Sequence, residues 1–274
     1  MQPSITIVTP SFNQAAYLEK TIQSVLAQRA DIHEYFVLDG GSTDDSVEII
    51  NKYASQIDYW ASRPDGGQAD AIRQGFERAT GDVLAWLNSD DLLLPGAIQA
   101  IRERFSSYPK TQVVTGHYCQ TDADGRLLRC MWVPRVRQSW LRWGVTRICQ
   151  PSTFFRRDFY ERIGGLDTHW QCVLDTELWC RMLSHNCNWH VLPQYVAARR
   201  YHSQTKGSTL TDQYRRERTE LAQRYPQYRP HAMKCMVGRW VFRGYQCCNR
   251  QFWRSTIDTL LHRHKQLPLS PTQV

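Results

Sequence analysis

The sequence predicts an α/β protein with a mostly parallel central sheet covered by helices and a helical basic extension at the C-terminal end. Three observations predict it. Short β-rich runs alternate with amphipathic segments over the first ninety residues, the pattern of parallel strands joined by helices. A hairpin signal and further strands follow between residues 111 and 201. Residues 229–274 carry eight basic side chains and one acidic one.

The first half of the chain is expected to hold four strands and three helices. Between the first two β-rich runs, apolar residues from Tyr17 to Leu26 recur every three or four positions, which is helical spacing. Gly81 ends the third helix before another buried strand. The strands are expected at 4–9, 35–38, 57–61 and 83–87, and the helices at 15–28, 47–53 and 68–79.

Polar residues gather directly after three of these strands, at 9–13, 39–44 and 88–91. In open α/β sheets, ligands bind beyond the carboxyl ends of the strands. The three clusters therefore predict one binding site along one edge of the sheet.

From residue 111 the pattern changes. Asp122-Ala-Asp-Gly125 has the composition of a hairpin turn, and Gly164-Gly165 precedes another helix. Strands are expected at 113–120, 127–133, 152–155 and 189–201, and a helix at 174–183.

The charges are unevenly distributed along the 274 residues, whose formal net charge is +8. Residues 1–100 carry six basic and 14 acidic side chains, whereas residues 101–228 carry 20 and 11. The acidic third suits metal or neutral polar chemistry, and the basic remainder suits phosphates or an anionic surface.

The sequence indicates neither a membrane span nor a disulfide scaffold. No apolar run approaches the roughly 20 residues of a transmembrane helix, and MQPSITIVTPSFNQ lacks the basic and apolar regions of a signal peptide. The nine cysteines include no pair at the two-residue spacing of zinc or redox motifs, which favours reduced thiols. We therefore expect a soluble or peripheral cytoplasmic protein.

Asn88-Ser-Asp-Asp91 directly follows a predicted buried strand. Adjacent carboxylates in an acidic region suit a hard cation, Mg²⁺ or Mn²⁺, that shares its site with substrate phosphates. The string alone leaves an alternative open, in which Asp90 caps the following helix.

Six segments between residues 4 and 183 form an ordered set: ITIVTPSFNQAAYLEKTIQSVLAQ, VLDGGSTDDS, GGQADAIRQGFERATGDVLAWLNSDDLLLPGA, QPSTFFRR, GGLD and LDTELWCRML. Each string is moderately specific, and the ordered set is far more so. Together they resemble the family 2 glycosyltransferases of the GT-A fold, inverting enzymes of the bacterial polysaccharide and cell-surface glycan type.

The resemblance implies a donor site. The loop from Thr9 to Asn13 is similar to the one that wraps the nucleotide base, and Asp39 matches the carboxylate that accepts the imide N–H of uracil. Relatives often carry an Arg-Asn pair where this chain has Ile72-Arg73. The implied donor-binding residues are Thr9, Pro10, Ser11, Asn13, Asp39, Asp65, Gln68, Arg73, Ser89 and Lys206.

The resemblance also implies a divalent metal cofactor, Mn²⁺ or Mg²⁺. Asp90 matches the chief metal ligand, Asp91 neighbours it, and His202 is similar to a histidine that completes the metal shell. Asn88 departs from the aspartate of many relatives and removes one negative charge. Lys206 or Arg200 would neutralise the leaving phosphates.

Asp175 aligns with the family's general base, which deprotonates the acceptor hydroxyl. Asp175 and Glu177 point roughly 200° apart on a helix, so we expect only one, Asp175, to face the site. The alternative is that Asp175 is an exposed acid favoured by the helix dipole. Trp170 and Trp179 could stack on sugar rings or pack in the core.

The function implied is a metal-dependent inverting glycosyltransferase that moves a sugar from a nucleotide-diphosphate donor, expected to be a UDP-sugar. The acceptor would be a hydroxyl of a glycan or lipid-linked saccharide. The catalytic domain would span 1–205, with a nucleotide-sugar-binding half at 1–110 and an acceptor-binding half at 111–205, before an extension at 206–274.

Two other function classes stay open. A sugar nucleotidylyltransferase would want a basic, Gly-rich loop after the first strand, where this chain has no Lys or Arg before Lys20. A non-catalytic nucleic-acid or membrane-binding module would use the basic tail, but no nucleic-acid-binding motif is present, so no nucleic-acid partner is expected.

Between residues 233 and 260, apolar positions three or four apart alternate with basic ones, which predicts one or two basic amphipathic helices. Such helices lie in anionic membrane interfaces or pack on the catalytic domain, and both possibilities stay open. Membrane contact through 229–265 would hold the protein on the inner face of the cell membrane, near a polyprenyl-linked acceptor.

Overall fold

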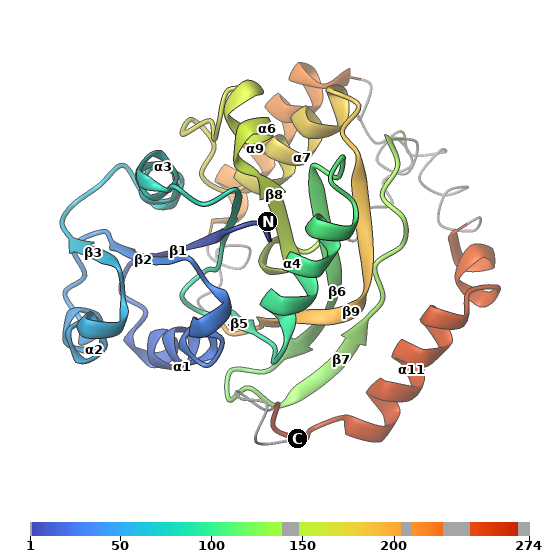
Figure 1. The fold of residues 1–274 in the computed structure, drawn as a ribbon, viewed down its shortest axis with the longest axis horizontal. Helices are drawn as coiled ribbons and strands as arrows, with labels where there is room; N and C mark the ends of the chain where they lie inside the picture. Colours follow the sequence, from blue (N-terminus) through green and yellow to red (C-terminus); the bar gives the residue numbers. More distant parts are fainter. Residues whose placement is uncertain (1, 139–147, 204–209, 227–241, 268–274) are drawn as a thin grey trace.

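The computed structural model describes residues 2–138, 148–203, 210–226 and 242–267. A curled, nine-stranded mixed sheet runs through the molecule with helices on both faces (Figure 1). The strand order is β3-β2-β1-β4-β8-β6-β9-β5, and β7 pairs with β6. The predicted α/β class with a helix-covered sheet is confirmed.

Four parallel strands form the N-terminal half of the sheet: β3 (Tyr59–Ser62), β2 (Glu34–Asp39), β1 (Ile5–Ser11) and β4 (Val83–Trp86). All of β1 is buried, as expected for a parallel strand covered on both faces. The register sets Ser11 beside Asp39 and Asp39 beside Ser62. The polar clusters predicted after the first two strands therefore meet at one edge.

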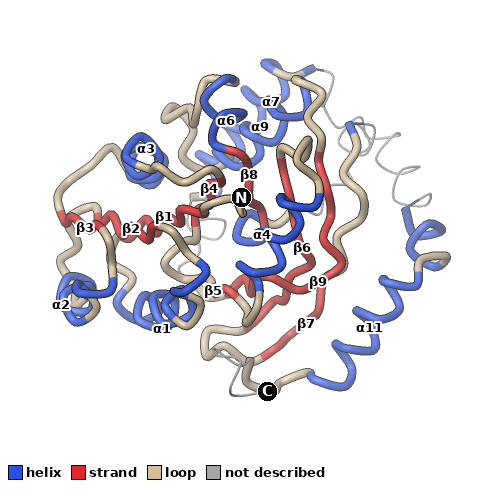
Figure 2. The backbone as a smooth tube through the Cα atoms, viewed as in Figure 1, coloured by secondary structure: helices blue, strands red, loops and turns tan. Residues whose placement is uncertain are grey.

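Helices cover the two faces of this half (Figure 2). α3 (Gln68–Arg78) packs on β1 and β2 from one side. α1 (Ala15–Leu26) and α2 (Ser46–Lys52) pack together on the other side. Because side chains alternate along a strand, Val8 of β1 joins the core under α3, and Ile7 joins the core under α1.

Gly75 marks a close approach of α3 to β1. A Cβ added there would lie 2.6 and 2.7 Å from the two γ-methyl carbons of Val8. We expect Gly75→Ala to destabilise the fold by roughly 1–2 kcal/mol, because overpacking outweighs alanine's better helix propensity. Urea unfolding measures the change. Gly244→Ala is the matched control, since nothing lies within 4 Å of its added Cβ; a similar loss in both variants would contradict the packing argument.

The C-terminal half of the sheet is mixed. β8 (Thr153–Arg156) runs antiparallel to β4 and β6 (Val113–Thr121), and β9 (Trp189–Arg200) is parallel to β6. β7 (Leu127–Met131) forms the predicted hairpin with β6, and β5 (Leu92–Leu93) pairs with the end of β9. The helices of this half are α4 (Ala97–Ser107), α6 (Arg157–Arg162) and α7 (Leu174–Ser184).

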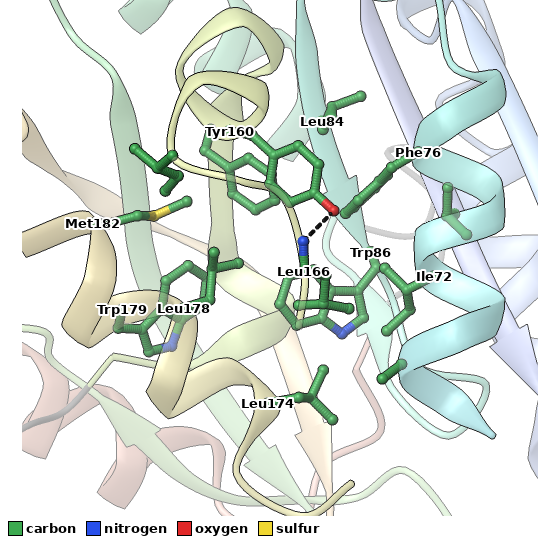
Figure 3. Close-up of a cluster of buried hydrophobic side chains, with 14 of the residues drawn as sticks. Ile72, Phe76, Leu84, Trp86, Tyr160, Leu166, Leu174, Leu178, Trp179 and Met182 are labelled. Carbon is green, nitrogen blue, oxygen red and sulfur yellow. Dashed lines mark hydrogen bonds between the residues drawn. The ribbon is translucent and has the colours of Figure 1, made fainter. Parts of the chain in front are cut away.

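An apolar core joins α3, β4 and α7 (Figure 3). The indoles of Trp86 and Trp179 stack with ring centroids 5.9 Å apart. The Tyr160 hydroxyl accepts the Leu166 N–H at 2.8 Å, which satisfies a buried polar atom. Trp179 and the fully buried Trp170 therefore pack in the core rather than on a sugar-binding surface.

α9 (Thr211–Arg224) and α11 (Arg250–His262) follow later in the described chain. α11 packs on β7, where the Thr259 hydroxyl accepts the Cys130 N–H at 2.8 Å. None of the described helices is long and apolar enough to cross a membrane. Much of the predicted amphipathic segment, residues 227–241, lies outside the described residues.

Candidate active site

Asp39, at the end of β2, organises the loop that follows it. Its buried Oδ2 accepts the N–H groups of Gly41 (3.1 Å) and Ser42 (2.8 Å) and the Ser62 hydroxyl (2.7 Å). Among the described residues, Oδ1 accepts the Ser42 hydroxyl alone, at 2.5 Å. A carboxylate oxygen has two acceptor directions, so Oδ1 keeps one for a ligand N–H.

The loop between β1 and α1 is locked to the loop after β2. Asn13 lies in the left-handed region, with φ of 51°, which asparagine tolerates better than most residues. Its N–H donates to the Ser42 hydroxyl at 2.7 Å, and its Oδ1 accepts the Thr43 N–H at 2.9 Å. Asn13 therefore holds the two loops together, and its contact with the donor stays a prediction.

The three predicted donor residues before it are buried strand residues. Thr9 hydrogen-bonds to the Tyr35 hydroxyl at 3.2 Å, and Pro10 pairs with Leu38 in the sheet. The Ser11 hydroxyl is buried without a hydrogen-bond partner among the described residues. Thr9 and Pro10 therefore belong to the buried strand that precedes the β1–α1 loop.

A third cluster lies next to Asp39 and contains Phe12, Gly40 and Asp65. A Cβ at Gly40 would lie 3.3 Å from both carboxylate oxygens of Asp65 and 3.3 Å from the Phe12 ring. Phe12 is 59% exposed, which is unusual for a phenylalanine. An exposed ring beside Asp39 and Asp65 offers a surface on which a base can stack.

Gln68, the first residue of α3, contacts the loop after β4. Its Nε2 donates to Asn88 Oδ1 at 2.6 Å, a bond for which the amide at position 88 is well suited. Arg73 is directed elsewhere, since it pairs with Asp70 (2.8 Å) and Glu77 (2.6 Å) along α3. The structure does not bring Arg73 to the other predicted donor residues.

Asp90 and His202 come together from positions far apart in the chain. Asp90 Oδ2 lies 3.0 Å from His202 Nε2. β5, which begins two residues after Asp90, pairs with the end of β9, and His202 follows β9. The pairing of these two strands thus assembles the predicted metal ligands.

The backbone around Asp90 is held by α1. The Thr21 hydroxyl lies 2.8 Å from the carbonyl oxygens of both Ser89 and Asp91. Ser89 is buried at this anchor. β5 follows at once and α4 begins only at Ala97, so the alternative in which Asp90 caps a helix is wrong.

Asp91 makes a different contact from Asp90. Its carboxylate is buried, and Oδ1 accepts the Arg200 N–H at 3.0 Å. Burial, and then repulsion by Asp90, raises the pKa of Asp91 well above its ordinary value. Asp91 therefore lies at the β5–β9 junction, and among the described residues it does not form a three-ligand metal site with Asp90 and His202.

The Arg200 side chain is 1% exposed, and none of its guanidinium nitrogens has a hydrogen-bond partner among the described residues. The group lies 4.9 Å from the centre of the Tyr17 ring, which also contacts the His202 ring at 4.3 Å. Burial lowers the pKa of Arg200. Unfilled donors on a buried cation near Asp90 suit an anionic ligand.

Asp175, in the first turn of α7, is partly buried, and burial raises its pKa above the ordinary value. Its Oδ1 accepts the N–H of Thr176 at 2.6 Å. The Cys149 thiol lies within electrostatic range of both Asp91 and Asp175, so the start of α7 and the loop after β4 border the same region.

Glu177 is fully buried and bonds to Arg181 at 2.8 Å and to the Tyr225 hydroxyl at 2.6 Å. Its carboxylate is therefore committed to the core. Of the two acids at the start of α7, Asp175 stays the predicted general base.

The sequence analysis does not single out three side chains that lie at or near the candidate site: Phe12, Tyr17 and Glu217. Phe12 and Tyr17 look like ordinary apolar residues until the fold places them. Glu217 of α9 accepts backbone N–H groups just before α7. Lys206, predicted near the diphosphate, lies outside the described residues.

Asp90 and His202 would offer a metal ion two ligands, one oxygen and one nitrogen. No group of three or more His, Cys, Asp or Glu side chains in the described residues is arranged to hold a metal ion. Mg²⁺ and similar ions are often bound by one or two protein groups with substrate phosphates and water. The pair fits an ion whose remaining ligands come from a phosphorylated substrate.

Solved structures share the fold. Staphylococcus aureus TarS, in complex with UDP-GlcNAc, matches with a TM-score of 0.64 over 80% of this chain and 65% of its own, at 15% identity. A mannosyltransferase from Pyrobaculum calidifontis, in complex with GDP-Man and Mn²⁺, matches with a TM-score of 0.60 over 95% and 76%, at 15% identity. The fold is that of the GT-A glycosyltransferases.

The chain belongs to glycosyl transferase family 2, whose model matches residues 6–164, more than half of its length. An uncharacterised glycosyltransferase of Mycobacterium tuberculosis is 43% identical over 90 residues, 32% of this chain and 34% of that protein. A PGL/p-HBAD biosynthesis glycosyltransferase of Mycobacterium bovis is 25% identical over 186 residues, 66% and 70% of the two chains. The first of these matches spans about a third of the relative's length.

Proposed function

We propose that this chain is a metal-dependent, inverting glycosyltransferase that moves a sugar from a nucleoside-diphosphate donor to a hydroxyl of a glycan or lipid-linked saccharide. The observation that carries the proposal is the meeting of Asp90 and His202, at 3.0 Å, on the sheet edge that also holds Asp39. Family membership and the nucleotide-sugar complexes of the structural neighbours support it.

A uracil nucleotide suits the surroundings of Asp39 better than a guanine nucleotide does. Uracil offers one imide N–H, and Asp39 Oδ1 keeps one acceptor direction. Guanine would present two N–H groups along its edge to that one direction. Phe12 would stack on the base, and Asp65 and Gln68 would lie toward the ribose and the sugar.

The diphosphate would lie between Asp90, His202 and Arg200. A bound Mn²⁺ or Mg²⁺ would act as a Lewis acid on the leaving diphosphate. Asp90 and His202 would hold that ion, and the Arg200 guanidinium would give its unfilled N–H donors to phosphate oxygens. Lys206 stays a predicted second cation.

Asp175 would act as the general base. Its carboxylate takes the proton of the acceptor hydroxyl while that oxygen bonds to the anomeric carbon and the bond from that carbon to the diphosphate oxygen breaks. A single displacement inverts the anomeric configuration. The raised pKa of Asp175 makes it a stronger base than an exposed aspartate.

Incubation with a panel of UDP-, GDP- and dTDP-sugars and saccharide acceptors, with and without Mn²⁺, tests this function. We expect release of UDP that needs both acceptor and metal, and NMR should show a product of opposite anomeric configuration. Retention of configuration would contradict the mechanism. Formation of a nucleotide-sugar from a nucleoside triphosphate and a sugar phosphate would favour the nucleotidylyltransferase alternative.

We also infer that α11 contacts an anionic membrane surface. Its outer face carries Trp253, Ile257, Leu260 and Leu261, which are 50–73% exposed and follow helical spacing. The opposite face bonds to the sheet through Thr259. A lipid-linked acceptor would be met at such a surface.

Charge favours an anionic lipid surface as the partner of this face. Arg250 and Arg254 are exposed on the same arc of α11 as the apolar stripe. Asp258, the one acidic residue after residue 228, is turned to the sheet and accepts the Tyr195 hydroxyl at 3.0 Å. Apolar stripes flanked by arginine bind anionic interfaces.

The triple change Ile257→Glu, Leu260→Glu and Leu261→Glu should weaken binding to phosphatidylglycerol vesicles by more than ~10-fold, because three apolar side chains no longer enter the interface. Vesicle pelleting measures it. Tyr108→Glu, at a 48% exposed aromatic outside α11, is the control and should pellet like the wild type. Equal pelleting of the triple variant would rule this face out as the contact.

A further inference from the structure

We propose that Glu217 of α9 is a positioning residue that sets the general base Asp175 against the donor loop. The inference rests on the proposed function, because it assigns a role to Glu217 in that reaction. Glu217 lies outside the segment that matches the family model. Its carboxylate is the centre of a contact between α9 and residues 165–173, the stretch that leads into α7.

Glu217 binds the backbone directly before the base. Its Oε2 lies 3.2, 2.8 and 3.2 Å from the N–H nitrogens of Gln171, Cys172 and Val173. Oε1 is also 3.2 Å from the Gln171 nitrogen. The side chain is 7% exposed, so water competes little for these bonds. Three successive N–H groups aimed at one carboxylate form a rigid anion-binding turn, and Asp175 lies two residues beyond it.

The rest of α9 presents the same face to this stretch. Gln213 donates to Glu217 Oε1 at 2.9 Å, which orients the carboxylate. Glu220 contacts His169 at 3.0 Å, and Arg224 donates to Asp167 at 2.8 Å. These four residues recur at helical spacing, so one stripe of α9 makes all the contacts. Glu217 is the buried member, whereas the Glu220–His169 pair is exposed.

A second contact holds α7 itself. The Tyr225 hydroxyl, at the end of α9, donates to Glu177 at 2.6 Å. Asp175 therefore lies between two segments that contact α9 or its end. Residues 171–173 precede it in the chain, and Glu177 follows it. The base has little freedom to move along or across the site.

The turn at residues 171–173 also contacts the loop that follows Asp65. Gln171 donates from Nε2 to the Gly66 carbonyl at 3.4 Å. A Cβ at Gly67 would lie 2.8 Å from Gln171 Oε1, so the amide covers this glycine closely. Gly66 and Gly67 directly follow Asp65, a predicted donor residue. By fixing Gln171, Glu217 fixes the distance between the donor loop and the base.

This arrangement predicts a split between catalysis and nucleotide binding. The bonds of Glu217 reach neither Asp39 nor the Asp90–His202 pair, so the loss of Glu217 should leave UDP affinity within ~2-fold of the wild type. A misplacement of about 1 Å at the base costs ~100-fold in rate. We therefore expect Glu217→Ala to lower the single-turnover transfer rate at saturating donor by ~100-fold.

Glu217→Gln is the conservative variant. An amide oxygen at the Oε2 position keeps accepting the three N–H groups, so transfer should recover to within ~10-fold of the wild type. Glu220→Gln removes the same charge from an exposed position of the same helix and should behave like the wild type. A structural role alone would not order the three variants in this way.

The pH profile gives a second readout. Burial raises the pKa of Asp175, and hydrogen bonds from Thr176 and the charge of Arg199 of β9 oppose that shift. Burial and, to a smaller extent, Asp175 raise the pKa of the neighbouring Cys149 and Cys180 thiols. Freed from Glu217, the turn admits water to Asp175 and lowers its pKa. The acid limb of the transfer rate should therefore move to lower pH in Glu217→Ala, and stay in place in Glu220→Gln.

Hydrogen exchange tests the contact without any substrate. The amides of residues 171–173 should exchange faster in Glu217→Ala and stay protected in Glu217→Gln and Glu220→Gln. Unchanged protection in Glu217→Ala would overturn the proposal, as would equal losses of transfer and UDP affinity. Wild-type protein that binds UDP but transfers to no acceptor would refute the proposed function, while the exchange result would still decide the role of Glu217 in holding this turn.

Discussion

Asp175→Asn is expected to bind UDP as the wild type does and to transfer sugar ~10²–10⁴-fold more slowly, the contribution typical of a positioned general base. Asparagine keeps the shape and the Thr176 contact and cannot take the acceptor's proton. Single-turnover transfer and calorimetric UDP binding measure the two effects. Asp212→Asn is the control, because it makes the same change at an exposed position in the first turn of another helix, α9. Retained transfer in Asp175→Asn would remove Asp175 as the base.

The same carboxyl sets an expected pH dependence. Transfer needs ionised Asp175, and burial raises its pKa, so the rate should fall with decreasing pH at a higher pH than an exposed aspartate would give. Because the pKa is raised in the folded state, ionisation of Asp175 opposes folding at neutral pH. Asp175→Asn should therefore be at least as stable as the wild type there, which thermal unfolding at pH 7 can check.

Asp90→Asn is expected to abolish the metal dependence of UDP binding and to lower transfer by about three orders of magnitude, several kcal/mol of lost charge stabilisation. His202→Gln should resemble it, and the double variant should lose little more, because both residues hold the same ion. Calorimetry with UDP, with and without Mn²⁺, measures this.

Asp91→Asn serves as the matched comparison for Asp90→Asn. Its amide oxygen can still accept the Arg200 N–H, so metal-dependent binding should persist. Loss of metal-dependent binding in Asp91→Asn would place Asp91 among the ligands after all. Additive losses in the Asp90→Asn, His202→Gln double variant would show that the two residues do not share one ion.

The half of the site built on parallel strands could be predicted because local sequence determines it. Thr9–Asn13 and Asp39–Asp44 each follow a short β-rich run, and the parallel register of β1 and β2 then brings their ends together. Hairpin composition at Asp122–Gly125 predicted β6 and β7 in the same way.

The remaining contacts depend on elements that meet only in the fold. The Asp90–His202 distance follows from the two-residue strand β5, too short to give a periodic signal. Glu217 binds backbone N–H groups more than 40 residues earlier in the chain. Because nearly every residue has a backbone N–H, the sequence cannot indicate which of these groups a side chain will bind. The orientation of Asp91 toward Arg200 rests on the same β5–β9 junction, and adjacency to Asp90 alone could not predict it.

We propose that the sheet edge around Asp39, Asp90 and His202 binds a nucleoside diphosphate together with a divalent metal. The decisive experiment is calorimetric titration of UDP, GDP and dTDP into the full chain, with and without Mn²⁺. We expect UDP-selective binding that needs the metal and is lost in Asp90→Asn. Binding of none of the three nucleotides, or binding indifferent to both the metal and Asp90→Asn, would contradict it.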